Sequence, residues 1–403
     1  MLMASSVSCG PSPRRERPQP NASSETEHAS PLAAAIDRAA GYLSRACGAT
    51  GRFTYRENLD DPGIEARYNI LRHAGAAYAL SSYYHRTGSE EAGKAVLRAG
   101  EYVLQNHVRP LEREPQLWAV WSLPGEEARD GRAVAKLGGT ALGIVALVET
   151  RRIDPGAVPV TTLEALGSFL TFMQRPSGGF FSRYDDTHGF DREFGSLYYS
   201  GEAILALTML YEETGDTRWR EAAVEGALFL IRERAQVPRE RLPADHWFMI
   251  ASARLRKYLG PWETSLTRDA LRDHNRELAL KMLAERAEVT EGWARGSFVV
   301  DGRSTPTATR LEGLLALYGW LDEADPLRRE IADAAKAGVA FLRNCQVRSG
   351  PGQGGVTRAV RKLSSESPSF NRRQNEIRID YVQHALSAWL GYSAHGLDVP
   401  LTP

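Results

Sequence analysis

Apolar residues along most of the chain recur three and four positions apart, the spacing of a helix with one buried face. From residue 31 onward these segments come in pairs, separated by connections that contain Gly or Pro. The first segment of each pair carries Arg, Glu and Lys between its apolar positions, which predicts a surface helix with one buried stripe. These first segments span residues 31–47, 90–105, 162–173, 217–234, 268–286 and 325–344.

The second segment of each pair is rich in Ala, Leu and Gly and is apolar on nearly every side. Such a helix is expected to be buried on both sides. The second segments begin near Arg67, Lys136, Tyr199, Asp245, Thr307 and Arg378. A surface helix followed by a buried helix, repeated six times without a break, predicts an all-α fold, an (α/α)6 toroid of six helical hairpins.

The connections differ between the two faces of this ring. Gly-rich stretches with β-prone residues follow three of the surface helices, at residues 51–55, 178–182 and 354–357, and predict short extended segments. The connections on the opposite face are short helix stops, as at residues 214–216. Long loops on one face of a rigid scaffold predict that a functional site lies there.

Composition supports one large domain over residues 31–403. The chain has 403 residues, of which 42% are apolar, and its formal net charge is zero. A neutral balance gives no reason to expect nucleic-acid binding. No apolar run reaches the roughly 18–20 residues of a membrane span. Cys47 and Cys345 end apolar helical runs and predict small buried thiols, and we expect no cofactor and no metal.

Residues 1–30 are polar and Pro-rich and predict a disordered tail. The stretch Ser-Val-Ser-Cys-Gly around Cys9 is similar to the end of a bacterial lipoprotein signal, but what precedes it is short and has no basic residue. Two interpretations stay open. Cys9 carries a lipid anchor and the protein belongs to the cell envelope, or the tail is an ordinary extension of a cytoplasmic protein.

The repeat pattern from Leu32 to Tyr392, with the phrase at residues 199–203 and 211–216, resembles the six-hairpin toroid families. These are glycoside hydrolases and polysaccharide lyases of this fold, the N-acylglucosamine 2-epimerase type, and part of the glucuronyl epimerases. The resemblance implies the toroid fold and chemistry on a carbohydrate. It carries over no single member's catalytic residues, because the match lies in the pattern alone.

Other toroids require motifs that differ from those of this chain. Protein prenyltransferases and lanthionine cyclases bind zinc through Cys, and no Cys lies at the start of a buried helix. Class II terpene cyclases need an Asp-x-Asp-Asp motif, which is absent. These three classes are therefore excluded.

In a closed ring, the N-terminal ends of the six buried helices meet at the long-loop face. Their aligned dipoles favour an anionic ligand there. The catalytic candidates are Asp245, Glu202, His246 and Glu312. The candidates for binding a carbohydrate substrate are Tyr68, Arg72, His73, Tyr199, Trp247, Arg310, Arg378, Asp380, Tyr381, His384 and Asp186.

Each catalytic candidate has a structural alternative. Asp245 follows Pro243 and Ala244 and can cap its helix instead of acting as a carboxylate in the cavity. Glu202 lies in the first turn of an apolar helix, where it either complements the helix dipole or becomes a general acid with a raised pKa. Glu312 is either a partner in a structural ion pair or a second catalytic carboxylate.

Two further groups have open roles. Asp380 and His384 lie one helical turn apart, so that Asp380 orients His384 or the pair only ties the last helix to the first. The acidic loop 184–193, which contains Asp186, could hold calcium or supply an acid. It lacks the ligand spacing of an EF-hand, which favours a solvated loop.

These candidates support two types of chemistry on a poly- or oligosaccharide, including one that contains uronic acids. Glycosidic cleavage needs two carboxylates. Epimerisation and elimination need a base, often His or Tyr, beside a carbon acid, with Arg to hold a carboxylate. Both sets are present, so the sequence does not choose between hydrolase, lyase and epimerase. The alternative is a non-catalytic glycan-binding or scaffold protein of the cell envelope.

Overall fold

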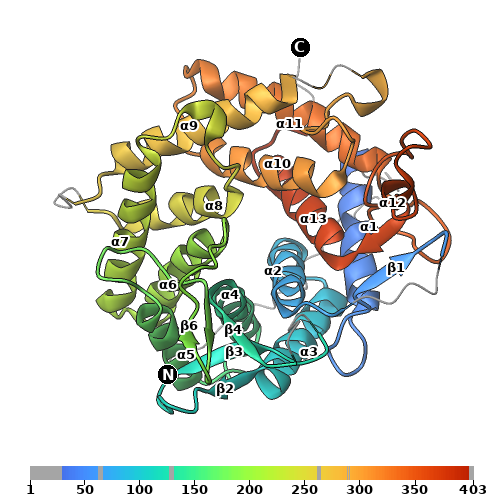
Figure 1. The fold of residues 1–403 in the computed structure, drawn as a ribbon. Helices are drawn as coiled ribbons and strands as arrows, with labels where there is room; N and C mark the ends of the chain where they lie inside the picture. The colour runs from blue at the N-terminus through green and yellow to red at the C-terminus, as the bar shows by residue number, and fades with distance from the viewer. Residues whose placement is uncertain are drawn as a thin grey trace, which may run out of the picture.

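A computed structural model describes residues 30–61, 67–126, 131–260, 265–287, 289 and 291–398. Two concentric sets of helices form its framework (Figure 1). The outer helices are α1 (Pro31–Ala46), α3 (Glu90–Asn106), α5 (Val160–Phe172), α7 (Thr217–Arg234), α9 (Arg268–Ala287) and α11 (Pro326–Asn344). The inner helices are α2 (Ile70–Thr87), α4 (Leu137–Ile153), α6 (Tyr199–Thr214), α8 (His246–Leu255), α10 (Ser304–Tyr318) and α13 (Ile379–Ala394).

The inner helices close into a ring. Each one contacts the next in chain order, and α13 returns to contact α2. The predicted all-α toroid of six hairpins is thereby confirmed, and each predicted helix lies within a few residues of its observed position. The remaining helical segments are short: η1 (Arg239–Arg241), η2 (Arg256–Tyr258), η3 (Gly292–Ala294) and α12 (Pro368–Asn371).

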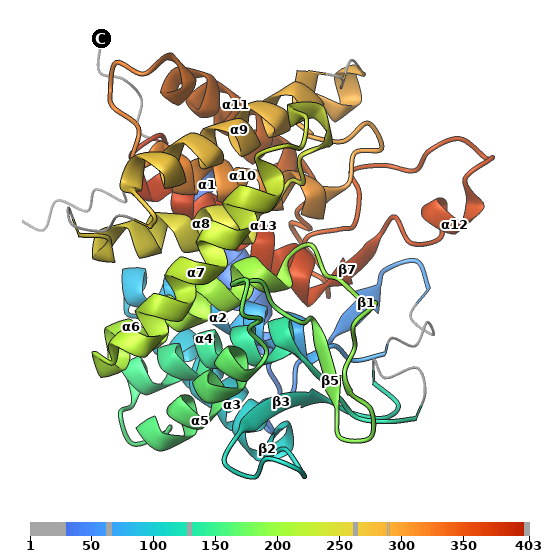
Figure 2. The same cartoon turned by 60° about the vertical axis from the view of Figure 1, so that its left-hand side comes forward.

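The strands gather at one end of the ring (Figure 2). β1 (Arg56–Asn58) pairs antiparallel with β7 (Glu376–Arg378). Five more form an antiparallel sheet in chain order: β2 (Val108–Pro110), β3 (Trp118–Ser122), β4 (Val134–Lys136), β5 (Arg183–Asp185) and β6 (Gly189–Phe190). Short extended segments were expected at this face. The Gly-rich stretches themselves form single bridges, such as Gln346↔Val356, and most strands lie elsewhere in the loops.

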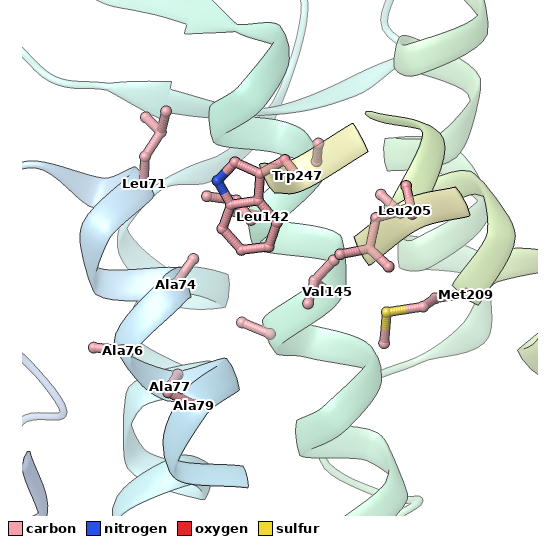
Figure 3. Packing of buried hydrophobic residues seen from close by; sticks show 14 of the residues in the cluster. Leu71, Ala74, Ala76, Ala77, Ala79, Leu142, Val145, Leu205, Met209 and Trp247 are labelled. Atoms are coloured by element: carbon pink, nitrogen blue, oxygen red, sulfur yellow. The ribbon is translucent and has the colours of Figure 1, made fainter. Parts of the chain in front are cut away.

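The composition of the inner helices matches their position between the outer layer and the ring interior. In α4 every residue from Leu137 to Thr150 is buried, which suits its run of Ala, Gly, Leu and Val. Figure 3 shows Leu71 of α2, Leu142 of α4 and Trp247 of α8, which line one cavity inside the ring. Small residues let the inner helices approach one another, while these larger ones shape the space that remains.

The Gly-rich connections place a glycine against the next outer helix. Gly51 and Gly354 have φ of 82° and 91°, a region that favours glycine. A Cβ atom on Gly51 would lie 2.0 Å from the backbone oxygen of Arg98, and one on Gly354 would lie 1.9 Å from that of Arg38. Gly354 therefore joins the connection after α11 to α1, which closes the outer layer.

We expect Gly354→Ala to lower the free energy of unfolding by about 2 kcal/mol or more, because alanine adds both a left-handed strain and a backbone clash. Gly215→Ala is the matched control: Gly215 also has positive φ, of 72°, but nothing lies within 4 Å of its Cβ position. It should cost about 1 kcal/mol. Urea unfolding of both variants measures the difference, and equal losses would contradict the role given to the contact with Arg38.

The remaining sequence predictions concern the cysteines, the tail and the membrane. Cys47 and Cys345 are buried thiols, as predicted. No helix in the described part of the chain combines the length and apolar character that crossing a bilayer requires. Cys9 and the predicted tail, apart from Ser30, lie outside the described residues.

Candidate active site

A cavity of about 590 Å³ opens at the end of the ring where the inner helices begin. Its wall comes from the first turns of α2, α6, α8, α10 and α13 and from the loops above them. It is lined by Asn69, Leu71, Arg72, Leu142, Ser196, Tyr198, Tyr199, Glu202, His246, Trp247, Arg303, Thr305, Pro306, Thr309, Arg310, Arg358, Arg373, Arg378, Asp380, Tyr381, Gln383 and His384.

Most of the residues predicted from the sequence lie together in this cavity. The lining includes Arg72, Tyr199, Glu202, His246, Trp247, Arg310, Arg378, Asp380, Tyr381 and His384. Five predicted residues are not part of the lining, namely Tyr68, His73, Asp186, Asp245 and Glu312. Of these five, only Glu312 reaches a residue of the cavity by a direct side-chain contact described below.

His246, Glu312 and His384 form a buried cluster, here called the histidine cluster. His384 Nδ1 lies 2.7 Å from Glu312 Oε2, and His246 Nε2 lies 3.9 Å from the same oxygen. The two imidazole rings have centroids 5.4 Å apart. Glu312 itself lines a second cavity at the opposite end of the ring. Its carboxylate thus stands behind His384, between the two cavities.

The two imidazoles of the histidine cluster have opposite pKa shifts. Burial lowers the pKa of His246 well below its ordinary value, and the positive charges of His384 and Arg310 add to this effect. Burial also acts to lower the pKa of His384, but the charge and hydrogen bond of Glu312 outweigh it and raise the pKa. Burial also raises the pKa of Glu312, so that His384 and Glu312 share a proton between them. These directions favour the neutral form of His246 and the protonated form of His384.

His246 has free hydrogen-bonding capacity. Both of its ring nitrogens are buried and make no hydrogen bond among the described residues. Its ring stands edge-on to Tyr198, with centroids 5.2 Å apart, and beside Trp247 at the same distance. A buried imidazole without partners is costly unless a ligand completes it. The unpartnered imidazole of His246 therefore indicates where a ligand would bind.

Glu202 is a buried carboxyl group, only 4% exposed. Burial, and then the negative charge of Asp245, raise its pKa to about 8. Its Oε2 atom makes no hydrogen bond within the described part of the chain. A Cβ atom on Gly138 would lie 2.1 Å from Oε2, so the glycine of α4 leaves the space that the carboxyl group occupies. Glu202 is therefore protonated at neutral pH and can donate a proton into the cavity.

Asp245 holds the start of α8 and lies outside the cavity lining. Its Oδ1 accepts a hydrogen bond from the Phe248 N–H, and its Oδ2 accepts one from Arg234 at 2.6 Å. Burial raises the pKa of Asp245, while Arg234 acts against that rise. These contacts correspond to the capping alternative considered for Asp245, since both of its oxygens are engaged with the protein.

Asp245→Asn is expected to destabilise the protein by about 3 kcal/mol or more, because Arg234 would remain as a buried charge without its counter-ion. Asn can still cap the helix, so the loss isolates the charge. Asp216→Asn is the control, since Asp216 caps α7 beside the exposed Arg218 and should cost less than about 1 kcal/mol. Thermal unfolding reports both. An inactive Asp245→Asn protein of unchanged stability would instead give Asp245 a catalytic role.

Tyr68, His73 and Asp186 are engaged elsewhere in the structure. The Tyr68 hydroxyl lies 2.7 Å from His73 Nδ1, and His73 Nε2 lies 2.9 Å from the Ala99 carbonyl oxygen. Burial lowers the pKa of His73 to about 3. Asp186 accepts a hydrogen bond from the Glu112 N–H in an exposed loop. The contact of Tyr68 with His73 fixes the segment before α2, the contact of His73 with Ala99 holds α2 against α3, and that of Asp186 holds one loop to another.

The acidic loop 184–193 forms a hairpin of β5 and β6. Asp185 Oδ1 accepts hydrogen bonds from the backbone N–H groups of Thr187 and His188, and Asp191 Oδ1 accepts those of Glu193 and Phe194. These carboxylates therefore act as turn residues.

Asp380 ties the last inner helix to the first. Arg378 donates two hydrogen bonds to it at 2.5 and 2.8 Å, and Arg72 Nε of α2 lies 3.2 Å from its Oδ2. Burial acts to raise the pKa of Asp380, but these two guanidinium groups lower it overall. His384 takes Glu312, not Asp380, as its hydrogen-bond partner. Of the two roles considered for Asp380, the contacts match the tie between helices.

Sequence reasoning missed three arginines in the cavity wall: Arg303, Arg358 and Arg373. Arg303 precedes α10, and the other two lie in the long connection between α11 and α13. The signal available was weak, consisting of a high density of Arg in that connection. Their convergence depends on loop pairing, such as the bridge between Arg303 and Ala359, which no local pattern encodes.

The histidine cluster also has the composition of a metal site. One ligand atom from each of its residues lies within 4.8 Å of the others. Two imidazoles and a carboxylate are ligands that Zn²⁺ accepts. His384 and Glu312 are also joined by a direct hydrogen bond, which suits the cluster to proton transfer.

Comparisons with known proteins agree on the fold. No protein-family model matches the chain, and no curated protein matches its sequence. Among solved structures, a sugar epimerase from a ruminal bacterium matches with a TM-score of 0.66 and 13% identity, over 92% of this chain and 99% of that one.

Two further solved structures match over similar lengths. Cellobiose 2-epimerase from Spirochaeta thermophila has a TM-score of 0.60 and 15% identity, over 90% of this chain and 96% of its own. An unsaturated glucuronyl hydrolase specific for heparin has a TM-score of 0.59 and 12% identity, over 91% and 97%. At these identities the matches establish the (α/α)6 toroid fold and nothing finer.

Proposed function

We propose that this chain is a carbohydrate-active enzyme that moves a proton at a carbon atom of a sugar, as an epimerase or isomerase does. The observation that carries the proposal is the pair of imidazoles in the histidine cluster, with ring centroids 5.4 Å apart at the cavity floor and pKa values shifted in opposite directions. Two titratable groups whose pKa values are pushed apart are a general acid and a general base.

The roles follow from the protonation states. His246 accepts the proton from the carbon next to the sugar's carbonyl group, and the electron pair left behind forms an enediol. His384, charged by Glu312, donates a hydrogen bond or proton to the carbonyl oxygen. Return of a proton to the same carbon from the opposite face gives the epimer. Return to the former carbonyl carbon, with loss of the proton from the other enediol oxygen, gives the isomer.

The aromatic part of the wall suits a sugar. Trp247, Tyr198, Tyr199 and Tyr381 line the cavity beside the histidine cluster. Such side chains offer apolar faces to the C–H groups of a sugar ring and polar tips to its hydroxyls. The two structural neighbours named as epimerases support the proposal at the level of fold.

The test is the incorporation of deuterium from D₂O into reducing sugars, followed by NMR. Exchange at the carbon next to the carbonyl, with formation of an epimer or ketose, is the expected result. If exchange persists in EDTA, the histidine cluster acts as acid and base. If EDTA abolishes exchange, the histidine cluster binds a metal ion that the reaction needs. Sugar binding without exchange or product would favour the non-catalytic alternative.

Glu202 supports a second candidate function, glycosidic cleavage. A carboxyl group with a pKa of about 8 is a general acid at neutral pH. Among the described residues, the cavity wall contains two carboxyl groups, those of Glu202 and Asp380. Asp380 is bound to Arg72 and Arg378. Cleavage would need Asp380 as the second carboxylate. Release of a shorter sugar from an oligosaccharide, without carbon-bound exchange, would support this function.

The pH dependence of kcat/KM should separate the two functions. His246 must be neutral, and its pKa is lowered, so the acid limb is expected well below pH 6.5. His384 must be protonated, and its pKa is raised, so the alkaline limb is expected above pH 6.5. We therefore expect the highest kcat/KM between these two limbs. If Glu202→Gln removed the alkaline limb, the acid would be Glu202 and cleavage would be favoured.

A further inference from the structure

Six arginines line the cavity, and their partners leave an excess of positive charge. Asp380 forms ion pairs with both Arg72 and Arg378. Arg303, Arg310 and Arg373 pair with Asp301, Glu285 and Glu376, which lie outside the lining. Glu202 adds no charge at neutral pH because its pKa is about 8. The wall of a sugar-sized cavity is therefore cationic.

Arg358 has no carboxylate partner among the described residues. Its guanidinium stacks on Phe370, 4.5 Å from the ring centroid, and donates one long hydrogen bond of 3.5 Å to the Phe370 carbonyl oxygen. Burial lowers the pKa of Arg358, and the positive charges of Arg373 and Arg303 lower it further, while Tyr381 and Glu376 act against this shift. This half-buried cation therefore makes no direct ion pair with a carboxylate among the described residues.

The backbone holds Arg358 beside the start of α10. The Ser304 N–H donates to the Arg358 carbonyl oxygen at 2.9 Å, and the Ser304 hydroxyl donates to that of Thr357 at 2.7 Å. A bridge between Arg303 and Ala359 adds to this pairing. The position of Arg358 is thus set by the fold and not by a mobile loop contact alone.

Thr305 gives an independent sign of a ligand at the same place. It lines the cavity, and its Oγ1 atom is buried without a hydrogen-bond partner. The helix N-cap, Arg303, makes no side-chain capping bond. Because the Ser304 N–H is bound to Arg358 and Pro306 has no N–H, the Thr305 N–H is the donor that remains in the first turn of α10. A hydroxyl, one helix N–H group and guanidinium groups together form an anion-binding arrangement.

We propose that the substrate is a sugar bearing an anionic group, a carboxylate or a phosphate, which binds to Arg358, Arg303 and Thr305. The inference rests on the proposed function in taking the ligand to be a sugar. Glu312 follows Thr305 by seven positions on α10. The anion subsite therefore lies about 10 Å along the helix axis from the histidine cluster. The charged group is thus remote from the reacting carbon.

The test compares glucose, glucuronic acid and glucose 6-phosphate by calorimetric binding and by kcat/KM for deuterium exchange. We expect one acidic sugar to be preferred over glucose by about tenfold or more. Comparison of glucuronic acid with glucose 6-phosphate shows whether the cavity prefers a carboxylate or a phosphate. Arg358→Gln should reduce this preference by about tenfold, mainly through KM, and Thr305→Val should reduce it in the same direction.

Arg361→Gln is the matched control. Arg361 is an exposed arginine of the same connection, stacks on Trp293 and does not line the cavity. Its variant should keep the wild-type preference. The inference is overturned if neither acidic sugar is preferred in binding, or if Arg361→Gln lowers the preference as much as Arg358→Gln. Absence of exchange with every sugar would instead overturn the proposed function, because the calorimetric preference is measured without turnover.

Discussion

Replacing His246 with asparagine is expected to slow carbon-bound proton exchange by about a thousandfold, the range in which general base catalysis contributes. Asparagine keeps a polar side chain at the start of α8 but cannot accept a proton at neutral pH. His246 is suited to the role because burial keeps it neutral and both its nitrogens are unpartnered among the described residues. The loss should appear in kcat more than in KM, since the proton moves in the transition state.

His274→Asn is the matched control for this prediction. His274 of α9 is also buried, its pKa is lowered to about 4 by burial, and its Nε2 has no partner within the described residues. Its ring contacts Phe248 outside the cavity. Both variants bury an amide in place of an imidazole, so both share the cost to stability. Equal losses of exchange in the two would remove His246 from the mechanism.

The fold could be predicted from the sequence because each helix carries its own local signal. α7 begins after the N-cap Asp216 and ends at Arg234, and both bounds were predicted. The inner helix α4 is apolar on all sides, which indicated burial on two sides before any contact was known. The five-stranded sheet was not predicted as such, because its strands are two to five residues long and pair across loops.

The candidate site could be predicted only where local helix signals place its residues. Residues at the starts of inner helices were found because ring closure brings those ends together. The hydrogen bond between Glu312 and His384 was not predicted, because these residues are 72 positions apart on different helices. Arg358 was missed because its place depends on the pairing of a loop with the start of α10. Local periodicity contains no information about either contact.

The second large effect concerns Glu202, and it is an effect on stability. The pKa of this carboxyl group is raised from 4.5 to about 8 in the folded protein, so the unfolded chain releases the proton more readily. The wild-type protein should therefore lose stability as pH rises between these two values, by about 1.4 kcal/mol for each pH unit. By pH 8 the loss amounts to about 4 kcal/mol.

Glu202→Gln should abolish this loss, because glutamine keeps the shape of the protonated carboxyl group and cannot ionise. We expect the variant to gain about 4 kcal/mol over the wild type between pH 5 and pH 8, measured as the difference in free energy of unfolding. Other titrating groups cancel in this difference. Glu225→Gln, which removes an exposed carboxyl group of α7, controls for the loss of one negative charge.

The carboxyl group of Glu202 lowers the stability of the wild-type protein at neutral pH, and Gln would fill the same space without this loss. This argues that the carboxyl group is kept for its proton. If the reaction is glycosidic cleavage, activity and stability should then move in opposite directions: Glu202→Gln gives a more stable protein that cleaves its substrate less well. A difference between wild type and variant that stays constant from pH 5 to pH 8 would mean that Glu202 is already ionised in the folded state. Glu202 could then not donate a proton into the cavity.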